Sequence, residues 1–543
     1  MRSNLKFLFV IVVCCFFIIG TNDREYFKIN KSFDIFGSVF KEISNNYIFD
    51  IEPDDLMNAG IDGMLQSLDP YTEFYEENET DDIDFITNGS YTGFGIMVSL
   101  IDSNLTITGV HDGYSAQKCG LRIGDKIIQV DTSILTNKTN KDLRDFTRGV
   151  PGTKAKVYIK RDGIDSLLII NLEREIVNLG SVTYSGMLEN WIGYIKLERF
   201  NRSTISEFQS ALNNLKRNNK LNGLVIDLRD NSGGVLDAAI SICGMFIPVG
   251  EKIVETKGKI SNAYRVFNSI NPPQEPNLPL AVLIDENSAS ASEVVAGCLQ
   301  DLDRAVIIGK RSFGKGLVQS IVELPYKSEM KMTTAKYYTP SGRCIQKNEQ
   351  FGKLYKKTRP NSTKINDSVV FFTKNKRIVY ELNGIEPDTS TGKKNIPQLL
   401  DELSNRFVIF KFVNYLTGKL KSQADLTLTD EEILSKFKKS FIAYKTPANE
   451  LLKKLYKMAQ DEKFHEKALS GLKDMERIVA NEEWNYLMES KADLMKLIRS
   501  EINQRFFNQK KQLEENLLDD EDVRIAEDLI SSQQWKKILK REN

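Results

Sequence analysis

Three serines lie close together between residues 285 and 293. This segment follows an apolar run that predicts a strand and precedes an apolar-faced helix, and ligands bind beyond the carboxyl ends of strands in open α/β sheets. Unpaired backbone N–H groups at a helix N-terminus can also stabilise an oxyanion. The position suits a serine nucleophile, although the segment taken alone favours a serine-rich helix cap, because serine is a common cap residue. The residues alone do not choose among Ser288, Ser290 and Ser292.

A lysine between two glycines could supply the base for such a serine. Lys315 is flanked by Gly314 and Gly316, which lets the backbone pack closely around it. A lysine in water has a pKa of about 10.4, but burial disfavours its charged form and lowers the pKa. If residues 314–324 are extended, the alternation of side chains places Gln319 on the same face as Lys315. The amide of Gln319 could then position the amine.

The chain lacks the residue patterns of two other common kinds of site, a histidine-based hydrolase site and a cysteine-based metal or redox site. The chain has two histidines, His111 and His465, and neither lies in a segment typical of catalysis. The base of a hydrolase would therefore not be histidine. The six cysteines form no C-x-x-C pair, which excludes the usual spacing of zinc and thioredoxin-like sites. We predict neither a metal nor a cofactor.

A pair of glycines could contribute to stabilising the reaction's negative charge. The apolar run 225–228 leads through a short polar turn into Gly233 and Gly234. Backbone N–H groups in this turn could complete an oxyanion hole with the N–H of Ala291. Taken alone, the glycine pair predicts only a turn from strand to helix.

The elements that must position these residues alternate along the chain. Apolar runs predict strands, and helical spacing predicts helices between them: strands at 192–197, 223–228, 280–284 and 305–308, and helices near 204–215, 235–246 and 292–302. This alternation indicates an α/β core with a largely parallel sheet. Further strands are predicted at 316–324 and 331–338.

Two other regions flank this core. Short alternating runs with glycine turns predict a compact β-rich module, with strands at 95–100, 105–110, 126–130 and 155–160 and a helix at 140–147. Residues 33–68 and the residues beyond 395 show helical spacing instead.

Charge and the N-terminal residues limit partners and location. Lysine plus arginine (74) equals aspartate plus glutamate (74), so no overall field would recruit nucleic acid. Arg2 and Lys6 precede an apolar run from Phe7 to Ile19. This run predicts a secretory signal. It is shorter than the about 20 residues of a spanning helix, but no small-x-small cleavage site is clear after Ile19. The signal is therefore either cleaved or retained as an anchor.

The separated motifs together resemble those of carboxyl-terminal processing peptidases, also called tail-specific proteases. This family pairs a PDZ domain with a Ser/Lys peptidase core. The resemblance covers roughly residues 33–400 and rests on four motifs in the expected order: 228–234, 288–293, 313–316 with Gln319, and 384–388. It implies a crotonase-like α/β core.

The resemblance also implies a role for each candidate residue. Ser290 would be the nucleophile, Lys315 the base and Gln319 the residue that positions the base. The oxyanion donors would be the N–H groups of Ala291 and Gly234, in preference to Gly233.

The β-rich module resembles a PDZ domain in two segments. Tyr91, Gly93, Phe94, Gly95 and Ile96 match the loop whose successive N–H groups hold a terminal carboxylate. The strand after this loop pairs with the bound peptide. Residues 120–128 are similar to the glycine-aspartate turn and strand of PDZ domains.

We therefore predict a multidomain α/β protein with a PDZ module ahead of the peptidase core. The predicted parts are a signal peptide or membrane anchor (1–20), an N-terminal helical region (21–83), a PDZ domain (84–175), a Ser/Lys peptidase core (176–400) and a C-terminal helical domain (401–543).

The predicted activity is that of a serine endopeptidase. The PDZ domain would capture the free C-terminus of a protein or peptide while Ser290 attacks an upstream peptide bond and forms an acyl-enzyme. Two other interpretations are a PDZ scaffold with a degenerate peptidase fold and an acyl hydrolase of small esters. The intact Ser290, Lys315 and Gln319 argue against the scaffold, and an esterase would leave the PDZ domain without a purpose.

The predicted partners are substrates with a free C-terminus, and nucleic acid is not among them. The sequence does not decide whether an adaptor or activator protein binds, or whether the chain forms a homo-oligomer. The signal and the resemblance together imply a bacterial periplasm or cell envelope, with attachment to the inner membrane if the N-terminal segment is retained.

Overall fold

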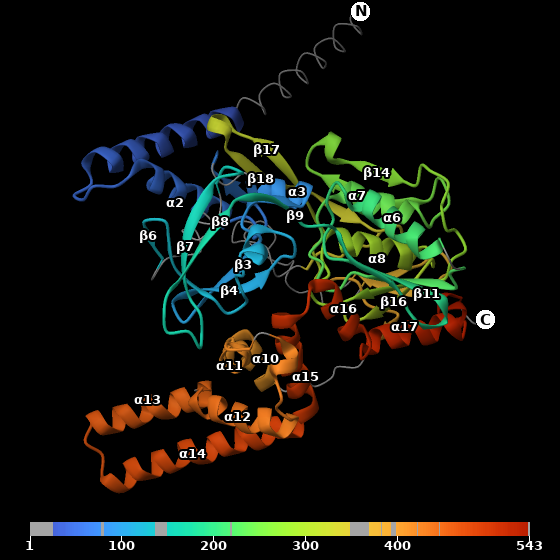
Figure 1. The fold of residues 1–543 in the computed structure, drawn as a ribbon. Helices are drawn as coiled ribbons and strands as arrows, with labels where there is room; N and C mark the ends of the chain where they lie inside the picture. The colour runs from blue at the N-terminus through green and yellow to red at the C-terminus, as the bar shows by residue number, and fades with distance from the viewer. Residues whose placement is uncertain are drawn as a thin grey trace, which may run out of the picture. The chain divides into compact units, whose positions relative to one another are not determined.

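The computed structural model describes residues 25–77, 81–135, 149–217, 220–347, 369–381, 383–391, 398–420, 422–444 and 446–540. The predicted signal segment and the predicted helix at 140–147 lie outside these residues. The chain forms two compact units (Figure 1). Residues 25–77 and 319–334 belong to the first unit, and the other described residues belong to the second.

The first unit joins the N-terminal helices to a small sheet. A helix covers residues 25–46, and α2 follows at Pro53–Leu65, so the predicted helical segment consists of two helices. Strand β1 (Glu73–Tyr75) then pairs antiparallel with β18 (Glu329–Tyr338), which also pairs with β17 (Leu317–Glu323). The division between the units falls within β17 and β18.

The PDZ region in the second unit contains the predicted strands. Its sheet has the order β3-β4-β5-β7-β8, and β3 lies at one end of this order. The strands are β3 (Ile96–Ile101), β4 (Asn104–Val110), β5 (Lys126–Val130), β7 (Lys154–Lys160) and β8 (Leu168–Glu173). Alternate residues of β7 face a buried cluster that includes Ile107 and Phe94, as expected for strands with one buried face.

The peptidase core is built around the predicted, largely parallel sheet. Its order is β10-β11-β12-β15-β16-β21, and every pair from β11 to β21 is parallel. The strands are β10 (Val182–Met187), β11 (Ile192–Leu197), β12 (Gly223–Asp227), β15 (Leu280–Ile284), β16 (Val306–Gly309) and β21 (Thr389–Ser390). The central strands are buried along their whole length, as parallel strands covered on both faces require.

Helices cover both faces of this sheet. On one face α6 (Thr204–Lys216), α7 (Leu236–Gly244) and α8 (Ala291–Asp301) pack into a large apolar cluster. On the other face lie α17 (Glu521–Ser531) and α18 (Trp535–Leu539). Figure 1 shows the strands between α8 and α17. The end of the chain thus supplies a layer of the core, a placement that its helical spacing did not reveal.

Five of the preceding C-terminal helices form a separate apolar cluster. They are α10 (Gln398–Asn405), α11 (Val408–Thr417), α12 (Asp430–Ala443), α14 (Glu466–Glu489) and α15 (Lys491–Phe506). Phe437 lies fully buried in this cluster, with its ring centroid 5.1 Å from that of Phe412. Helix α13 (Pro447–Asp461) packs along α14. Leu517 of α16 (Gln509–Leu517) packs with the apolar cluster of α17 and α18 instead. The predicted helical character of this region is confirmed.

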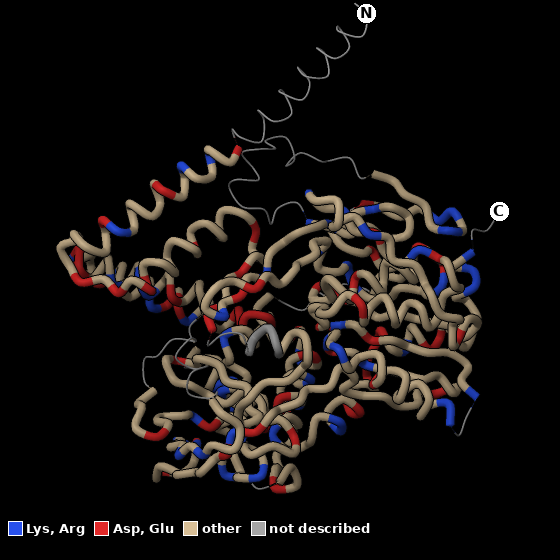
Figure 2. Tube along the Cα trace, turned by 90° about the horizontal axis from the view of Figure 1, so that it is seen from above, with Lys and Arg blue, Asp and Glu red and all other residues tan. Residues whose placement is uncertain are grey.

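Charge is distributed without large separation. Lys and Arg positions mix with Asp and Glu positions along the described trace (Figure 2), which agrees with the balanced composition. Within the part of the chain that the structure describes, no helix is long and apolar enough to cross a membrane.

We predict that the sheet depends on the packing of α17. Ile530 is 4 % exposed in the cluster beneath the strands, and Ile530→Ala should lower the free energy of unfolding by about 2–5 kcal/mol because it leaves a cavity. Leu518→Ala is the control, because Leu518 is 73 % exposed and surface changes are usually within about 0.5 kcal/mol. The midpoint of urea unfolding is measured for both variants. Equal midpoints for the two variants would contradict this packing.

Candidate active site

The structure separates the three serines by the partners of their hydroxyl groups. Ser288 Oγ donates to the carbonyl of Leu228, and Ser292 Oγ donates to the carbonyl of Asn231, each at 2.8 Å. Both serines are fully buried, whereas Ser290 is partly exposed. The hydroxyls of Ser288 and Ser292 are therefore used to join two loops, and Ser290 is the serine of the three that a substrate can reach.

Ser290 also has an unusual backbone conformation. It immediately precedes α8 and has φ 54° and ψ −112°. A positive φ is uncommon for a residue with a side chain and costs about 1–3 kcal/mol, so it persists only where surrounding contacts enforce it. These contacts involve both polar groups of the Ser290 backbone.

The first enforcing contact is the buried carboxylate of Glu293. Its Oε2 accepts the N–H groups of Ser290 and Lys315, both at 2.8 Å. Its Oε1 accepts the hydroxyl of Ser312 (2.6 Å) and the N–H of Gly314 (2.7 Å). One side chain therefore holds the turn that carries the serine and the loop that carries the lysine.

The electrostatics of Glu293 follow from its burial. Burial raises the pKa of the Glu293 carboxyl above its ordinary value, while the four hydrogen bonds act in the opposite direction. A buried charge needs its hydrogen bonds to offset lost solvation, so each donor to Glu293 contributes to keeping this link intact.

The second enforcing contact is the hydroxyl of Tyr337. It donates to the carbonyl of Ser290 at 3.1 Å and to the carbonyl of Lys315. Tyr337 is 1 % exposed, and its own N–H donates to the carbonyl of Gly316 at 3.0 Å. The backbones of Ser290 and Lys315 thus share two partners, one for their N–H groups and one for their carbonyls.

No role for Glu293 or Tyr337 was predicted from the motifs. The spacing of Ser290 and Glu293 is that of a capping box, in which the glutamate binds the N–H of the cap residue, so this contact had a recognisable signal. Tyr337 had none, because it comes from a distant strand that only the tertiary structure brings to the site.

One glycine of the pair lies against the candidate nucleophile, and the other lies against Phe200. Gly233 has φ 101°, and a Cβ there would lie 2.8 Å from Ser290 Cβ and 2.9 Å from the nitrogen of Ala291. A side chain at Gly233 would therefore collide with the serine turn. At Gly234, with φ 136°, a Cβ would overlap the carbonyl of Phe200.

The hydrogen bonds of this loop distinguish Gly233 from Gly234. The N–H of Gly233 already donates to Asn231 Oδ1 at 2.9 Å. Among the hydrogen bonds of the described residues, none uses the N–H of Gly234. Ala291 is the first residue of α8, where an N–H has no partner within the helix. The N–H groups of Gly234 and Ala291 are therefore not used by the hydrogen bonds of the described residues, and their role as oxyanion donors stays a prediction.

Gln319 lies on β17 in the first unit. Its amide donates to Thr333 Oγ1 at 3.4 Å, and the hydroxyl of Thr333 donates to Asp69 Oδ1 at 3.2 Å. Lys315 precedes β17, which begins at Leu317. The positioning role of Gln319 stays a prediction.

The predicted carboxylate-binding loop joins β2 (Ser90–Gly93) to the edge strand β3. Phe94 is 1 % exposed, and its carbonyl accepts the N–H of Ala116 at 3.0 Å. Gly95 has φ 77°, and a Cβ there would lie 2.5 Å from Tyr114 Cβ. Tyr91 lies on β2 and Ile96 begins β3. A peptide could therefore extend the sheet along β3.

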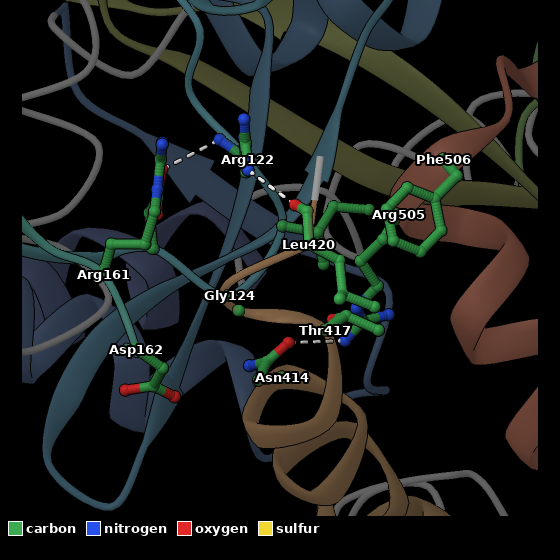
Figure 3. Close-up of a pocket in the computed structure, with 12 residues that line it drawn as sticks. Arg122, Gly124, Arg161, Asp162, Asn414, Thr417, Leu420, Arg505 and Phe506 are labelled. Carbon is green, nitrogen blue, oxygen red and sulfur yellow. Dashed lines mark hydrogen bonds and ion pairs between the residues drawn. The ribbon is translucent and has the colours of Figure 1, made fainter. Parts of the chain in front are cut away.

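A separate cavity of about 120 Å³ lies between the PDZ region and helices α11 and α15 (Figure 3). Arg122 donates to the carbonyl of Leu420 (3.3 Å), and Arg505 donates to Asn414 Oδ1 (2.7 Å). None of the candidate catalytic residues lines this cavity. The described residues contain no group of three or more His, Cys, Asp or Glu side chains arranged to hold a metal ion.

Three family models match the chain. Residues 82–160 match "PDZ domain", residues 191–352 match "Peptidase family S41", and residues 399–530 match "Probable PDZ-protease, C-terminal helical domain". The three matches follow the same order as the PDZ region, the central sheet and the C-terminal helices.

A relative from Bartonella bacilliformis decides the family. The carboxy-terminal-processing protease of that organism is 37% identical over 331 residues, which are 60% of this chain and 75% of the relative. This chain belongs to the carboxy-terminal-processing proteases. The carboxy-terminal processing protease CtpA of Bacillus subtilis is 28% identical over 366 residues, covering 64% of this chain and 76% of the relative. The family and its serine-type peptidase activity, both predicted from the motifs, are confirmed.

The solved structures include another protein of this kind. The photosystem II D1 C-terminal processing protease is 26% identical, with a TM-score of 0.36, and the match covers 64% of this chain and 83% of that protein. The predicted fold, a PDZ domain ahead of an α/β peptidase core, is confirmed for this carboxy-terminal-processing protease. Its domain boundaries and the roles of its site residues stay predictions.

We predict that turnover depends on the carboxylate of Glu293. In Glu293→Gln the new amide group would face N–H donors, so at least one hydrogen bond to Ser290, Lys315 or their loops is lost. Each unsatisfied buried group costs about 1–3 kcal/mol. We expect kcat for peptide hydrolysis to fall by at least about 100-fold, which corresponds to a rise of about 3 kcal/mol in the activation free energy.

The matched control is Glu286→Gln. Glu286 has an exposed side chain that pairs with Lys310 at 3.0 Å, so this substitution should leave kcat unchanged. Initial rates on an unstructured protein substrate measure both. Unchanged kcat in Glu293→Gln would show that the carboxylate does not align the two segments for catalysis.

Proposed function

We propose that this protein is a serine endopeptidase with a Ser290/Lys315 dyad, which cleaves substrates captured by their free C-termini. The observation that carries this proposal is the pair of shared contacts described above. Glu293 accepts the N–H groups of both residues, and Tyr337 donates to both carbonyls. These contacts fix the backbones of the serine and the lysine relative to each other, as a catalytic dyad requires.

In the proposed mechanism, the neutral amine of Lys315 takes the hydroxyl proton of Ser290. The Ser290 oxygen then attacks the carbonyl carbon of a peptide bond, and the N–H groups of Gly234 and Ala291 bind the oxyanion that develops. The Lys315 ammonium gives its proton to the leaving amine, which releases the C-terminal fragment. An acyl-enzyme remains.

Water completes the cycle. The neutral amine of Lys315 takes a proton from a water molecule, which attacks the acyl-enzyme ester. The same two N–H groups bind the second oxyanion. Ser290 then leaves as the alcohol with the proton from Lys315, and the new carboxyl terminus is released. Gln319 is the proposed positioner of the amine in both steps.

The PDZ domain is proposed to bring the substrate to this site. The loop from Tyr91 to Ile96 would hold the terminal carboxylate, and the peptide would pair with the edge strand β3. Main-chain pairing tolerates many sequences, so selection would rest on the free C-terminus and a few terminal side chains.

We also propose that the protein acts in a bacterial cell envelope. The apolar run from Phe7 to Ile19, preceded by Arg2 and Lys6, supports export. Processing or degradation of envelope proteins would be the corresponding role.

We predict that Ser290→Ala reduces cleavage of an unstructured protein to background, because no nucleophile remains. Lys315→Ala should lower kcat by at least about 100-fold, since a positioned general base contributes about 10²–10⁴. Lys310→Ala is the control, because Lys310 has an exposed side chain that pairs with Glu286. Full activity in Lys315→Ala would show that another base operates.

We predict that Gly95→Ala selectively weakens substrates with a free C-terminus, because its Cβ would displace Tyr114 and the adjoining loop. Gly113→Ala is the matched control. Gly113 has a similar φ of 85°, but nothing lies within 4 Å of its added Cβ. KM values for a peptide and for its C-terminal amide test this. An equal rise for both peptides would contradict capture through the carboxylate.

A further inference from the structure

The strand that leads to the oxyanion loop ends in a buried cluster of charges. Arg229 follows β12, and its Nε and Nη2 donate to the two carboxylate oxygens of Asp227, at 3.0 and 2.7 Å. Asp227 also accepts the hydroxyl of Tyr194 (2.6 Å) and is fully buried. Burial alone would raise the pKa of Asp227, but Arg229 and Lys196 lower it to about 2. Asp227 is therefore ionised at neutral pH.

The other side of the Arg229 guanidinium is held by the C-terminal region. Its Nη1 donates to Asp520 Oδ1 at 3.0 Å and to Asp522 Oδ2 at 2.9 Å. Its Nη2 lies 2.9 Å from Asp520 Oδ2. Three carboxylates thus surround one arginine side chain that is 17% exposed. Charge-assisted contacts at this degree of burial are stronger than surface ion pairs.

The side-chain carboxylates of Asp520 and Asp522 both lie at the start of α17. Asp520 is the residue that caps this helix, and its side chain accepts the N–H of Val523. Val523 and Ile530 then bury the helix against the sheet. The aspartates are therefore carried by a rigid element that is fixed to the strands and not by a mobile surface loop.

Arg229 is directly connected to the groups beside Ser290. Two residues later, Asn231 is fully buried and anchors the turn by donating to the carbonyl of Leu197 at 2.8 Å. Its Oδ1 accepts the N–H of Gly233, and its carbonyl accepts the N–H of Ala289 at 3.0 Å. A displacement of Arg229 would therefore be transmitted through this short turn to Gly233 and Gly234.

We infer that Asp520 and Asp522 are positioning residues for the oxyanion hole, which they align by fixing Arg229 at the start of the loop that ends at Gly234. This inference rests on the proposed function of that loop. It gives the C-terminal helices a part in catalysis, although neither aspartate touches the reacting atoms. Loss of both carboxylates leaves the Arg229 guanidinium with Asp227 alone, so the first residue of the loop loses the contacts that fix one side of its side chain.

The test compares two double variants with the same change in charge. Asp520→Asn with Asp522→Asn removes the carboxylates that bind Arg229, and asparagine still caps a helix. Asp519→Asn with Glu521→Gln is the control, because both residues are exposed and lie on the same turn. The charge at the N-terminus of α17 therefore changes equally in the two proteins.

Three measurements separate positioning from a general loss of structure. In the Asp520/Asp522 variant we expect kcat to fall by at least about tenfold, a part of the about 10²–10³ that removal of one oxyanion donor costs. KM and the Kd of a free-C-terminus peptide should stay unchanged. A peptide boronic acid, whose tetrahedral adduct needs the oxyanion hole, should bind at least about tenfold more weakly. The control variant should match the unsubstituted protein throughout.

Hydrogen exchange of residues 229–235 gives a readout that does not depend on activity. We expect faster exchange in the Asp520/Asp522 variant and unchanged exchange in the control. If this segment exchanges equally in both, or if kcat falls equally in both, the inference is wrong. If the unsubstituted protein cleaves nothing, the proposed function fails, and the exchange comparison still decides whether the aspartates fix the loop. Should the double variant not fold, Asp522→Asn alone removes one of the two carboxylates, keeps both contacts of Asp520 with Arg229 and allows the same comparison.

Discussion

One buried carboxylate determines the arrangement of the candidate active site. Glu293 accepts four hydrogen bonds from two loops, and it is fully buried, so none of these bonds competes with water. The strained backbone of Ser290 and the position of the Lys315 backbone both depend on it. Tyr337 repeats the same link through the carbonyls. A dyad whose members come from different loops needs such links, because neither residue is fixed relative to the other by chain connectivity.

The central sheet provides the surface on which these loops meet. The turn after β12 carries the glycine pair, and the turn after β15 carries Ser290, so parallel pairing of these strands brings the two turns together. Such a sheet needs an apolar layer on each face. Helices α6, α7 and α8 form one layer, and α17 and α18 from the end of the chain form the other. The C-terminal helices are therefore structural to the core as well as adjacent to the PDZ region.

Much of this organisation follows from the residue pattern. The strands at 192–197, 223–228 and 280–284 were predictable because short, mostly apolar runs of that length are typical of strands buried on both faces. The PDZ strands were predictable from alternation and glycine turns. The long-range contacts of Tyr337 and of the pair Asp520 and Asp522 were not, since local periodicity carries no information about which distant polar groups will meet.

The kind of protein could be predicted from the residues: the element order, the serine and lysine in their polar turns, and the motifs that resemble a peptidase family. The residue pattern alone left Ser288, Ser290 and Ser292 equivalent, and only the family resemblance implied Ser290. Only the tertiary structure showed that the hydroxyls of Ser288 and Ser292 are used by backbone carbonyls, and that α17 closes the second face of the sheet. The physical reason is that hydrogen bonding and burial are properties of atoms brought together in space, whereas spacing along the chain fixes only which side chains share a local face.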